Sequence, residues 1–161
     1  MNELKGSTNI AIEYLAYDSR KVGKFTLFVA VKGTQVDGHK YINSAIDAGA
    51  VCVVCQELPE TLNPEITYIV VDDSAVALGL ISANFHNNPS DKLKLIGVTG
   101  TNGKTTSVTL LFNLFRLLGY KVGLISTVEN RVHNEVIAST HTTPSSLELN
   151  ELLDKMVQKK C

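Results

Sequence analysis

The ten residues 97–106 constrain the fold of this chain more than any other segment. They read GVTGTNGKTT; the apolar run Leu93–Thr99 leads into them, and a run with helical spacing follows from Lys104 to about Leu118. A glycine-rich turn between a strand and a helix is the setting of a phosphate-binding loop. A second apolar run, Val122–Ser126, completes a predicted strand–helix–strand unit, and such units build parallel sheets.

The residue types in this loop suit the binding of a nucleoside triphosphate. Gly100 and Gly103 allow a tight turn whose N–H groups aim at phosphate oxygens, and the following helix presents its positive end to the same anion. Lys104 can reach the β- and γ-phosphates and is the candidate catalytic residue, while the Thr105 hydroxyl can ligate Mg²⁺. The predicted ATP-binding residues are Gly100, Thr101, Asn102, Gly103, Lys104, Thr105 and Thr106.

The loop departs from the generic pattern G-x-x-x-x-G-K-[ST] at one position. That pattern places its first glycine at residue 98, where this chain has Val98. The segment therefore matches only through the variant GTNGKT. The alternative is a glycine-rich turn without any ligand, which a buried and unpaired Lys104 would make costly.

Residues 1–90 predict a small domain of mixed α/β structure. Short β-branched runs indicate strands, and apolar residues three and four apart indicate helices. The expected strands are Thr26–Val31, Val51–Cys55 and Thr67–Val71, and the expected helices run from about His39 to Ala48 and from Asp73 or Ser74 to about His86. In the second helix we expect the side chains of Val76, Leu80, Ile81 and Phe85 to point inward.

The segment NNPSD at residues 87–91 predicts a boundary between domains at 1–90 and 91–161. The fold class is α/β, and the second domain would be the start of a parallel-sheet, P-loop ATPase-like domain. Thr143 or Ser145 is expected to cap its last helix, since Ser145 and Glu148 have the spacing of a capping box. The sequence ends where a further parallel strand is expected, so this domain is predicted to be incomplete.

Composition excludes several classes of partner. With 15 Lys and Arg against 16 Asp and Glu, no basic excess is present to bind nucleic acid or an anionic membrane. No apolar run approaches the roughly 20 residues of a transmembrane helix. Residues 1–10 do not resemble a signal peptide. These features predict a cytoplasmic protein.

Cys52 and Cys55 form a C-x-x-C pair inside a predicted strand. Side chains alternate between the faces of a strand, so an offset of three places the two sulfurs on opposite faces. No second pair follows at zinc spacing. We therefore expect buried thiols rather than a metal or redox site. The isolated histidines His39, His86 and His133 are assigned no function.

The loop sequence GTNGKTT at residues 100–106 resembles the ATP loop of the Mur ligases and of the related folylpolyglutamate synthases. Both are ATP-dependent ligases that join an amino acid to a carboxylate. The DSR segment at 18–20, with residues 25–31 and 33–39, is similar to the uridine-binding domain of the third-residue and fourth-step Mur ligases. Thr-Asn in the loop and HTTP at residues 141–144 favour the third-residue type. The resemblance covers nearly the whole chain.

The resemblance implies that the first domain binds a UDP-N-acetylmuramoyl dipeptide. The implied contacts are Ser19 for the uridine diphosphate, Thr34, Gln35 and Val36 for the uracil pocket, and Thr142 and Thr143 for the sugar-peptide part. The family often has His-Gln-Ala at the uracil pocket, so Thr34 replaces a ring-bearing residue. Without the resemblance, the DSR segment reads as a solvated turn with an Asp–Arg pair, and the TTP segment as a helix cap.

The resemblance also implies a reaction. ATP with Mg²⁺ would convert the free carboxylate of the dipeptide into an acyl phosphate, and the amine of a free amino acid, diaminopimelate or lysine, would then displace phosphate. Lys104 and Thr105 would supply part of the charge neutralisation. Further residues that the family uses, and the domain that binds the amino acid, have no match in this sequence. We expect this chain alone to be inactive.

Two alternatives remain open from the sequence. One is another ligase of the superfamily, such as the fourth-step Mur ligase or a folylpolyglutamate synthase, although the latter lacks the domain that carries the DSR segment. The other is a non-catalytic module that binds a nucleotide or UDP-sugar without turnover. Binding of a UDP-sugar peptide, as opposed to folate, would separate the ligases.

Overall fold

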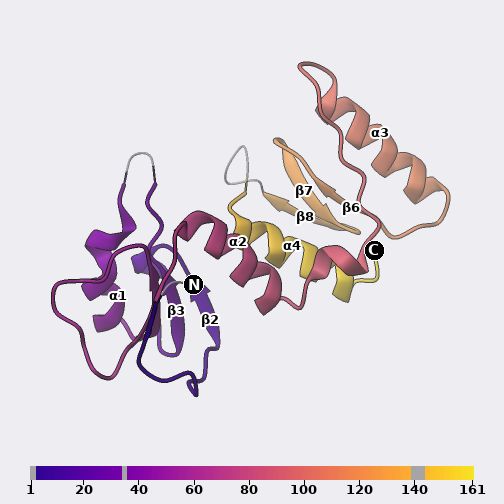
Figure 1. Cartoon of the computed structure of the whole chain (residues 1–161). Helices are drawn as coiled ribbons and strands as arrows, with labels where there is room; N and C mark the ends of the chain where they lie inside the picture. The colour runs from indigo at the N-terminus through magenta and orange to yellow at the C-terminus, as the bar shows by residue number, and fades with distance from the viewer. Residues whose placement is uncertain (1–2, 34–35, 139–143) are drawn as a thin grey trace. The chain divides into compact units, whose positions relative to one another are not determined.

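The structure is a computed structural model that describes residues 3–33, 36–138 and 144–161. The chain divides into two compact units, Met1–Ser82 and Ala83–Cys161 (Figure 1). The division falls within a helix, whereas the predicted domain boundary follows the end of that helix. Among the described residues, no helix combines the length and apolar character needed to cross a membrane.

The first unit is built on a five-stranded sheet. Its strands are β1 (Glu3–Lys5), β2 (Tyr14–Ala16), β3 (Thr26–Val29), β4 (Ala50–Cys55) and β5 (Thr67–Val70), in the spatial order β1-β5-β4-β3-β2. Strands β2 to β5 are parallel, and β1 runs antiparallel along β5. The helices are η1 (Ser19–Lys21), η2 (Gly38–Tyr41), α1 (Ile42–Asp47) and α2 (Ser74–Phe85). The mixed α/β architecture predicted for this part of the chain is confirmed.

Helices cover both faces of this sheet. On one face, Ile42 and Ala45 of α1 pack with Phe28, Val53 and other buried residues. On the other face, Ala77 and Leu78 of α2 pack with residues such as Val29 and Val54 of the sheet. The strands are therefore buried on both sides, which explains their continuous apolar sequence.

The two cysteines of β4 lie on opposite faces, as the strand geometry predicts. Cys55 belongs to the cluster that includes α1, and Cys52 to the cluster that includes α2. Burial raises the pKa of Cys52 to about 12 and that of Cys55 to about 11. Both thiols are protonated at neutral pH, so neither is a reactive nucleophile.

The inward face predicted for α2 is wrong for three of its four residues. Val76, Leu80 and Phe85 are exposed, and only Ile81 packs against the core. The buried positions are Ser74, Ala77, Leu78 and Ser82. These residues follow the same helical spacing, but their side chains are mostly small. A face of small side chains lets a helix approach a sheet closely, and hydrophobicity alone does not identify such a face.

The second unit packs a small sheet against a helix. Its elements are η3 (Pro89–Lys92), α3 (Lys104–Leu117), β6 (Gly123–Ile125), β7 (Glu129–Val132), β8 (Glu135–Ala138) and α4 (Ser146–Gln158). The buried core is formed by Val132 of β7 and by Leu152, Leu153 and Met156 of α4. Ser145 caps α4 and forms the predicted capping box with Glu148.

Two predictions for the second unit are wrong. They are the strand at Leu93–Thr99 and the parallel pairing of Val122–Ser126. Residues 94–99 have no regular structure, and β6 pairs antiparallel with β7, which pairs antiparallel with β8. The Ser126 side chain hydrogen-bonds backbone groups in the turn after β6, which favours this local hairpin. An isolated segment cannot satisfy a strand's backbone groups, and none of the described residues pairs with 94–99.

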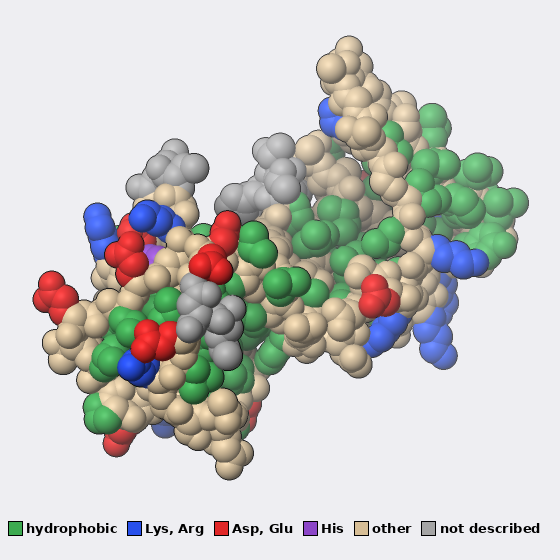
Figure 2. All heavy atoms as spheres, in the orientation of Figure 1, with side chains coloured by type: hydrophobic (Ala, Val, Ile, Leu, Met, Phe, Trp, Pro, Cys, Tyr) green, Lys and Arg blue, Asp and Glu red, His purple; other side chains and the backbone are tan. Residues whose placement is uncertain are grey.

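Helix α3 has its predicted apolar stripe. Phe112 is buried, and Val108, Leu111 and Phe115 are half-buried. The rest of the helix surface is also rich in leucine, with Leu110, Leu114, Leu117 and Leu118 exposed. Figure 2 shows hydrophobic side chains gathered over the C-terminal part of this helix. Gly119, at φ +89°, ends the helix as predicted.

Candidate functional site

The glycine-rich loop leads directly into α3. Gly103 is the N-cap residue at φ +78°, and Gly100 has φ +149°. A Cβ atom added at Gly103 would meet no other atom within 4 Å. The requirement for glycine at this position is therefore conformational, and the space above the loop is open.

The N-cap residue of α3 is Gly103, which has no side chain with which to cap the helix. The first turn of a helix has N–H groups without intrahelical partners, and the helix dipole makes this end positive. In α4, by contrast, the Ser145 hydroxyl accepts the Glu148 N–H. The uncapped start of a 14-residue helix after a glycine turn is suited to an anion.

Lys104 lies at the start of α3 and folds back over the loop. Its ammonium group donates a hydrogen bond to the carbonyl oxygen of Gly100, and its side chain is exposed. The lysine is therefore neither buried nor unpaired. An exposed ammonium held by one carbonyl can move to a phosphate oxygen, where a charge-assisted bond is stronger.

The remaining predicted loop residues differ in exposure. Thr105 is half-buried, whereas Thr101, Asn102 and Thr106 are exposed. No group of three or more His, Cys, Asp or Glu side chains that could hold a metal occurs in the part of the chain that the structure describes. Thr105 is the residue that the sequence offered as a candidate for Mg²⁺.

Ser19 begins the short helix η1, the element that follows β2. Asp18 is the N-cap and accepts the Arg20 N–H at 3.0 Å. The Arg20 guanidinium also binds the Asp18 carboxylate through Nε (2.9 Å) and Nη2 (2.7 Å). These hydrogen bonds lower the pKa of Asp18 to about 2. The local ion pair holds the turn, and Ser19 is half-buried within it.

The segment around Val36 follows β3. Val36 is exposed, and its carbonyl oxygen accepts the Gly33 N–H at 3.0 Å. Because β2 and β3 are parallel neighbours, Ser19 and Val36 both follow the carboxyl ends of strands, the edge where ligands bind in parallel sheets. Four predicted contacts lie outside the described residues: Thr34, Gln35, Thr142 and Thr143.

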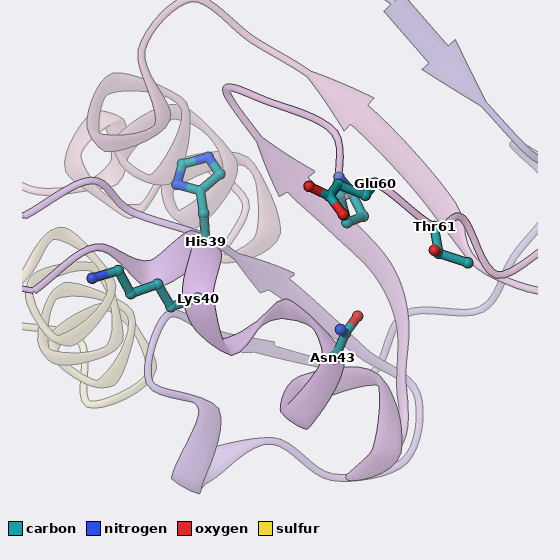
Figure 3. Close-up of a pocket in the computed structure, with 6 residues that line it drawn as sticks. His39, Lys40, Asn43, Glu60 and Thr61 are labelled. Atoms are coloured by element: carbon teal, nitrogen blue, oxygen red, sulfur yellow. The ribbon is translucent and has the colours of Figure 1, made fainter.

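His39 makes two side-chain contacts that the sequence did not indicate. Its Nδ1 lies 2.6 Å from Asp37 Oδ1, and its Nε2 accepts the Gln56 N–H at 2.9 Å. The only sequence signal is the Asp-x-His spacing of Asp37 and His39. Figure 3 shows His39 and Lys40 projecting from η2 beside a hollow. The hollow has a volume of about 510 Å³ and is lined by His39, Lys40, Asn43, Pro59, Glu60 and Thr61.

Two family models match this chain. Residues 11–86 match the catalytic domain of the Mur ligase family, and residues 98–161 match the Mur ligase middle domain. A relative from Cytophaga hutchinsonii, named UDP-N-acetylmuramoyl-L-alanyl-D-glutamate–2,6-diaminopimelate ligase, is 54% identical over 159 residues. The match covers 98% of this chain and 33% of that relative, so the chain spans about a third of the length of the curated relatives.

Solved structures of such ligases share the fold. The structure of a UDP-N-acetylmuramoyl-L-alanyl-D-glutamate–2,6-diaminopimelate ligase has a TM-score of 0.72 at 24% identity, covering 92% of this chain and 30% of that one. The MurF ligase from Thermotoga maritima, solved in complex with ADP, has a TM-score of 0.58 at 21% identity and covers 91% and 30%. These likenesses show the fold, and the two family models together with the close relatives show that the chain belongs to the Mur ligase family.

Proposed function

We propose that this chain supplies the UDP-sugar-binding and ATP-binding parts of a ligase that adds a third amino acid to UDP-N-acetylmuramoyl-L-alanyl-D-glutamate. The observation that carries the proposal is the GTNGKTT loop, which opens an uncapped helix with two glycines at positive φ. The name and the 54% identity of the Cytophaga relative support this substrate, and they favour diaminopimelate over lysine as the amino acid.

The loop residues fit the phosphates of ATP. The amides at the start of α3 would bind phosphate oxygens, and Gly103 leaves the approach clear because no atom lies within 4 Å of its Cβ position. Lys104 would leave the Gly100 carbonyl and hold the β- and γ-phosphates. ATP, when bound, supplies the phosphoryl group that activates the substrate carboxylate.

Thr105 would provide the protein ligand to Mg²⁺ on this loop. Its hydroxyl lies one residue after Lys104 in the first turn of α3, and it is half-buried. Mg²⁺ retains several waters and takes few protein ligands, so a single hydroxyl and the phosphates suit it. Thr101, Asn102 and Thr106 would complete the wall of the phosphate site.

The first unit would bind the UDP-sugar at the carboxyl edge of its parallel strands. Ser19 after β2 and Val36 after β3 would contact the uridine diphosphate end, together with Thr34 and Gln35. Thr142 and Thr143 would contact the sugar-peptide part. We also propose a reducing cytoplasmic setting, which suits two buried thiols on opposite faces of β4.

Calorimetric titration of this chain tests the proposal directly. We expect it to bind UDP-N-acetylmuramoyl-L-alanyl-D-glutamate and, separately, magnesium ATP. Lys104→Ala should weaken ATP binding by at least tenfold, the loss expected for a charge-assisted contact. Lys94→Ala is the matched control, because it removes the same charge from an exposed position before the loop.

The titration results test the ATP loop and the UDP-sugar site separately. Loss of ATP binding in Lys104→Ala but not in Lys94→Ala would support the loop assignment. A folded chain that binds folate but not the UDP-sugar peptide would contradict the proposed substrate. Equal ATP affinity in the parent chain and Lys104→Ala would contradict the role of the lysine.

A further inference from the structure

Asn102 and Gly103 form the only Asn-Gly pair in the sequence, and they lie in the glycine-rich loop that leads into α3. In such a pair the backbone nitrogen of the glycine can attack the carboxamide carbon of the asparagine and close a five-membered ring. Glycine has no side chain to shield its nitrogen, and its backbone adopts the required conformation easily. The pair is therefore chemically suited to deamidation.

The fold leaves this pair open to reaction. Asn102 is exposed, and residues 100–103 belong to no helix or strand. Among the described residues, neither the Asn102 carboxamide nor the Gly103 N–H takes part in a hydrogen bond. No atom lies within 4 Å of the Cβ position of Gly103. No hydrogen bond or packed neighbour therefore keeps the carboxamide away from the backbone nitrogen.

Positive charge beside the pair favours the attack. Ring closure requires the Gly103 N–H to lose its proton, and nearby positive charge stabilises the anion that results. The N-terminal end of α3, which begins at Lys104, is one source of this charge. The Lys104 ammonium is a second source, because it folds back over the loop to the Gly100 carbonyl. The charge that suits the loop to phosphate thus also promotes this reaction.

We propose that Asn102 is a site of spontaneous deamidation, and that the carboxylate formed there inactivates the ATP loop. The Gly103 nitrogen bonds to Cγ of Asn102, and the side-chain nitrogen leaves as ammonia with the proton from the Gly103 N–H. Water then opens either carbonyl of the resulting succinimide, which leaves aspartate or isoaspartate at position 102. The loss of ATP binding rests on the proposed function, whereas the modification itself does not.

The new carboxylate has opposite effects on the helix and on ATP. It stands one residue before the N-cap of α3, where a negative charge stabilises a helix. The same charge repels the phosphates of ATP and competes with them for the Lys104 ammonium. We therefore expect Asn102→Asp to raise the denaturation midpoint while it weakens ATP binding. A general loss of structure would lower both.

Peptide mapping by mass spectrometry after incubation at mildly alkaline pH measures the modification. We expect the mass gain of one deamidation at Asn102, and isoaspartate that an isoaspartyl methyltransferase labels with radioactive S-adenosylmethionine. A synthetic peptide of residues 97–106 gives the rate without the fold, and the folded chain should react at a comparable rate. Asn113 is the internal control, because it is exposed but is followed by Leu114 within α3, where helical hydrogen bonds hold the backbone.

Calorimetry with magnesium ATP on fresh and aged preparations measures the consequence. We expect the aged parent chain to lose ATP-binding sites in proportion to its deamidated fraction. Aged Asn102→Gln should keep the affinity that it had when fresh, because its longer side chain must close a less favourable six-membered ring. Asn102→Asp should bind ATP about tenfold more weakly than the parent chain. Asn113→Asp, which adds the same charge to α3 beyond the loop, should bind ATP as the parent chain does.

The inference is supported if Asn102 is modified and Asn113 is not, and if ATP binding falls in the aged parent chain and in Asn102→Asp but not in aged Asn102→Gln. A folded chain that stays unmodified at Asn102 while the peptide deamidates would overturn it. Unchanged ATP affinity in Asn102→Asp would also overturn it, and would leave the proposed function intact. A chain that deamidates but binds no ATP when fresh would overturn the proposed function and the inactivation with it, and would confirm the modification alone.

Discussion

At the residue scale, Gly103 is held in a backbone conformation that side chains rarely adopt. Its φ is +78°, and nothing lies within 4 Å of its Cβ position. We therefore expect Gly103→Ala to cost about 1 kcal/mol through backbone strain and not through a clash. Chemical denaturation, monitored through the helical signal, measures the change in the free energy of unfolding. An ATP titration measures the change in ATP affinity. Gly97→Ala is the control, because Gly97 has open space around its Cβ position and no positive φ. A loss of unfolding free energy in Gly97→Ala equal to that in Gly103→Ala would contradict the role of backbone strain.

The Asp18–Arg20 pair makes a prediction about pH. The hydrogen bonds from Arg20 lower the pKa of Asp18 from its ordinary value of 3.8 to about 2. A depressed carboxyl pKa stabilises the folded state above the unfolded value, and this contribution disappears as the pH falls through the folded pKa. The exposed Arg20 limits its size to below about 1 kcal/mol.

Carboxyl NMR titration tests this assignment. The Asp18 resonance should titrate near pH 2 in the parent chain and at a higher pH in Arg20→Gln, which keeps the backbone N–H of residue 20 but loses the guanidinium. The unfolding free energy of the parent chain should fall between pH 4 and pH 2 by more than that of Asp18→Asn. An Asp18 midpoint that does not move in Arg20→Gln would show that the ion pair is not formed.

At the scale of elements, the start of α4 depends on its capping box. The Ser145 hydroxyl accepts the Glu148 N–H at 3.2 Å, and Glu148 in turn accepts the Ser145 N–H at 2.9 Å. We expect Ser145→Ala to reduce the free energy of unfolding by about 1 kcal/mol. Ser145→Thr should restore most of the loss because its hydroxyl can accept the same N–H and can donate to the Glu148 carboxylate, as Ser145 does at 3.0 Å. Equal destabilisation by both variants would argue against the cap.

The elements also show what could be predicted from this sequence. Local rules identified the faces of Cys52 and Cys55, the apolar stripe of α3 and the cap of α4, because strand alternation, helical spacing and capping depend on nearby residues. The face of α2 was missed because the buried side chains there are small. The strand expected at Leu93–Thr99 was wrong because strand formation depends on a distant partner.

The candidate site also has a part that the sequence could predict and a part that it could not. The glycine turn that leads into α3 was predictable because a contiguous motif carries both its glycines and its lysine. The hydrogen bonds of His39 were not, because Asp37 and Gln56 come from separate segments. Only the fold of the parallel sheet brings these residues together. An Asp-x-His spacing alone would not have indicated a role.

At the scale of the whole molecule, the chain spans about a third of its curated relatives, and this bears on its activity. Phosphoryl transfer requires metal and positive charge to neutralise the triphosphate, and amide formation requires a positioned amine. Lys104 and Thr105 would supply only part of this. We therefore expect the 161-residue chain to bind ligands without forming a peptide bond.

A phosphate-release assay with UDP-N-acetylmuramoyl-L-alanyl-D-glutamate, magnesium ATP and diaminopimelate checks this expectation. Release should not depend on the amino acid, and mass spectrometry should find no tripeptide product. Calorimetry on the same preparation must show binding of both nucleotides, so that inactivity is not mistaken for misfolding. Amino-acid-dependent release that disappears in Lys104→Ala would contradict the expectation, because it would show that the loop and the UDP-sugar site complete the reaction without further residues.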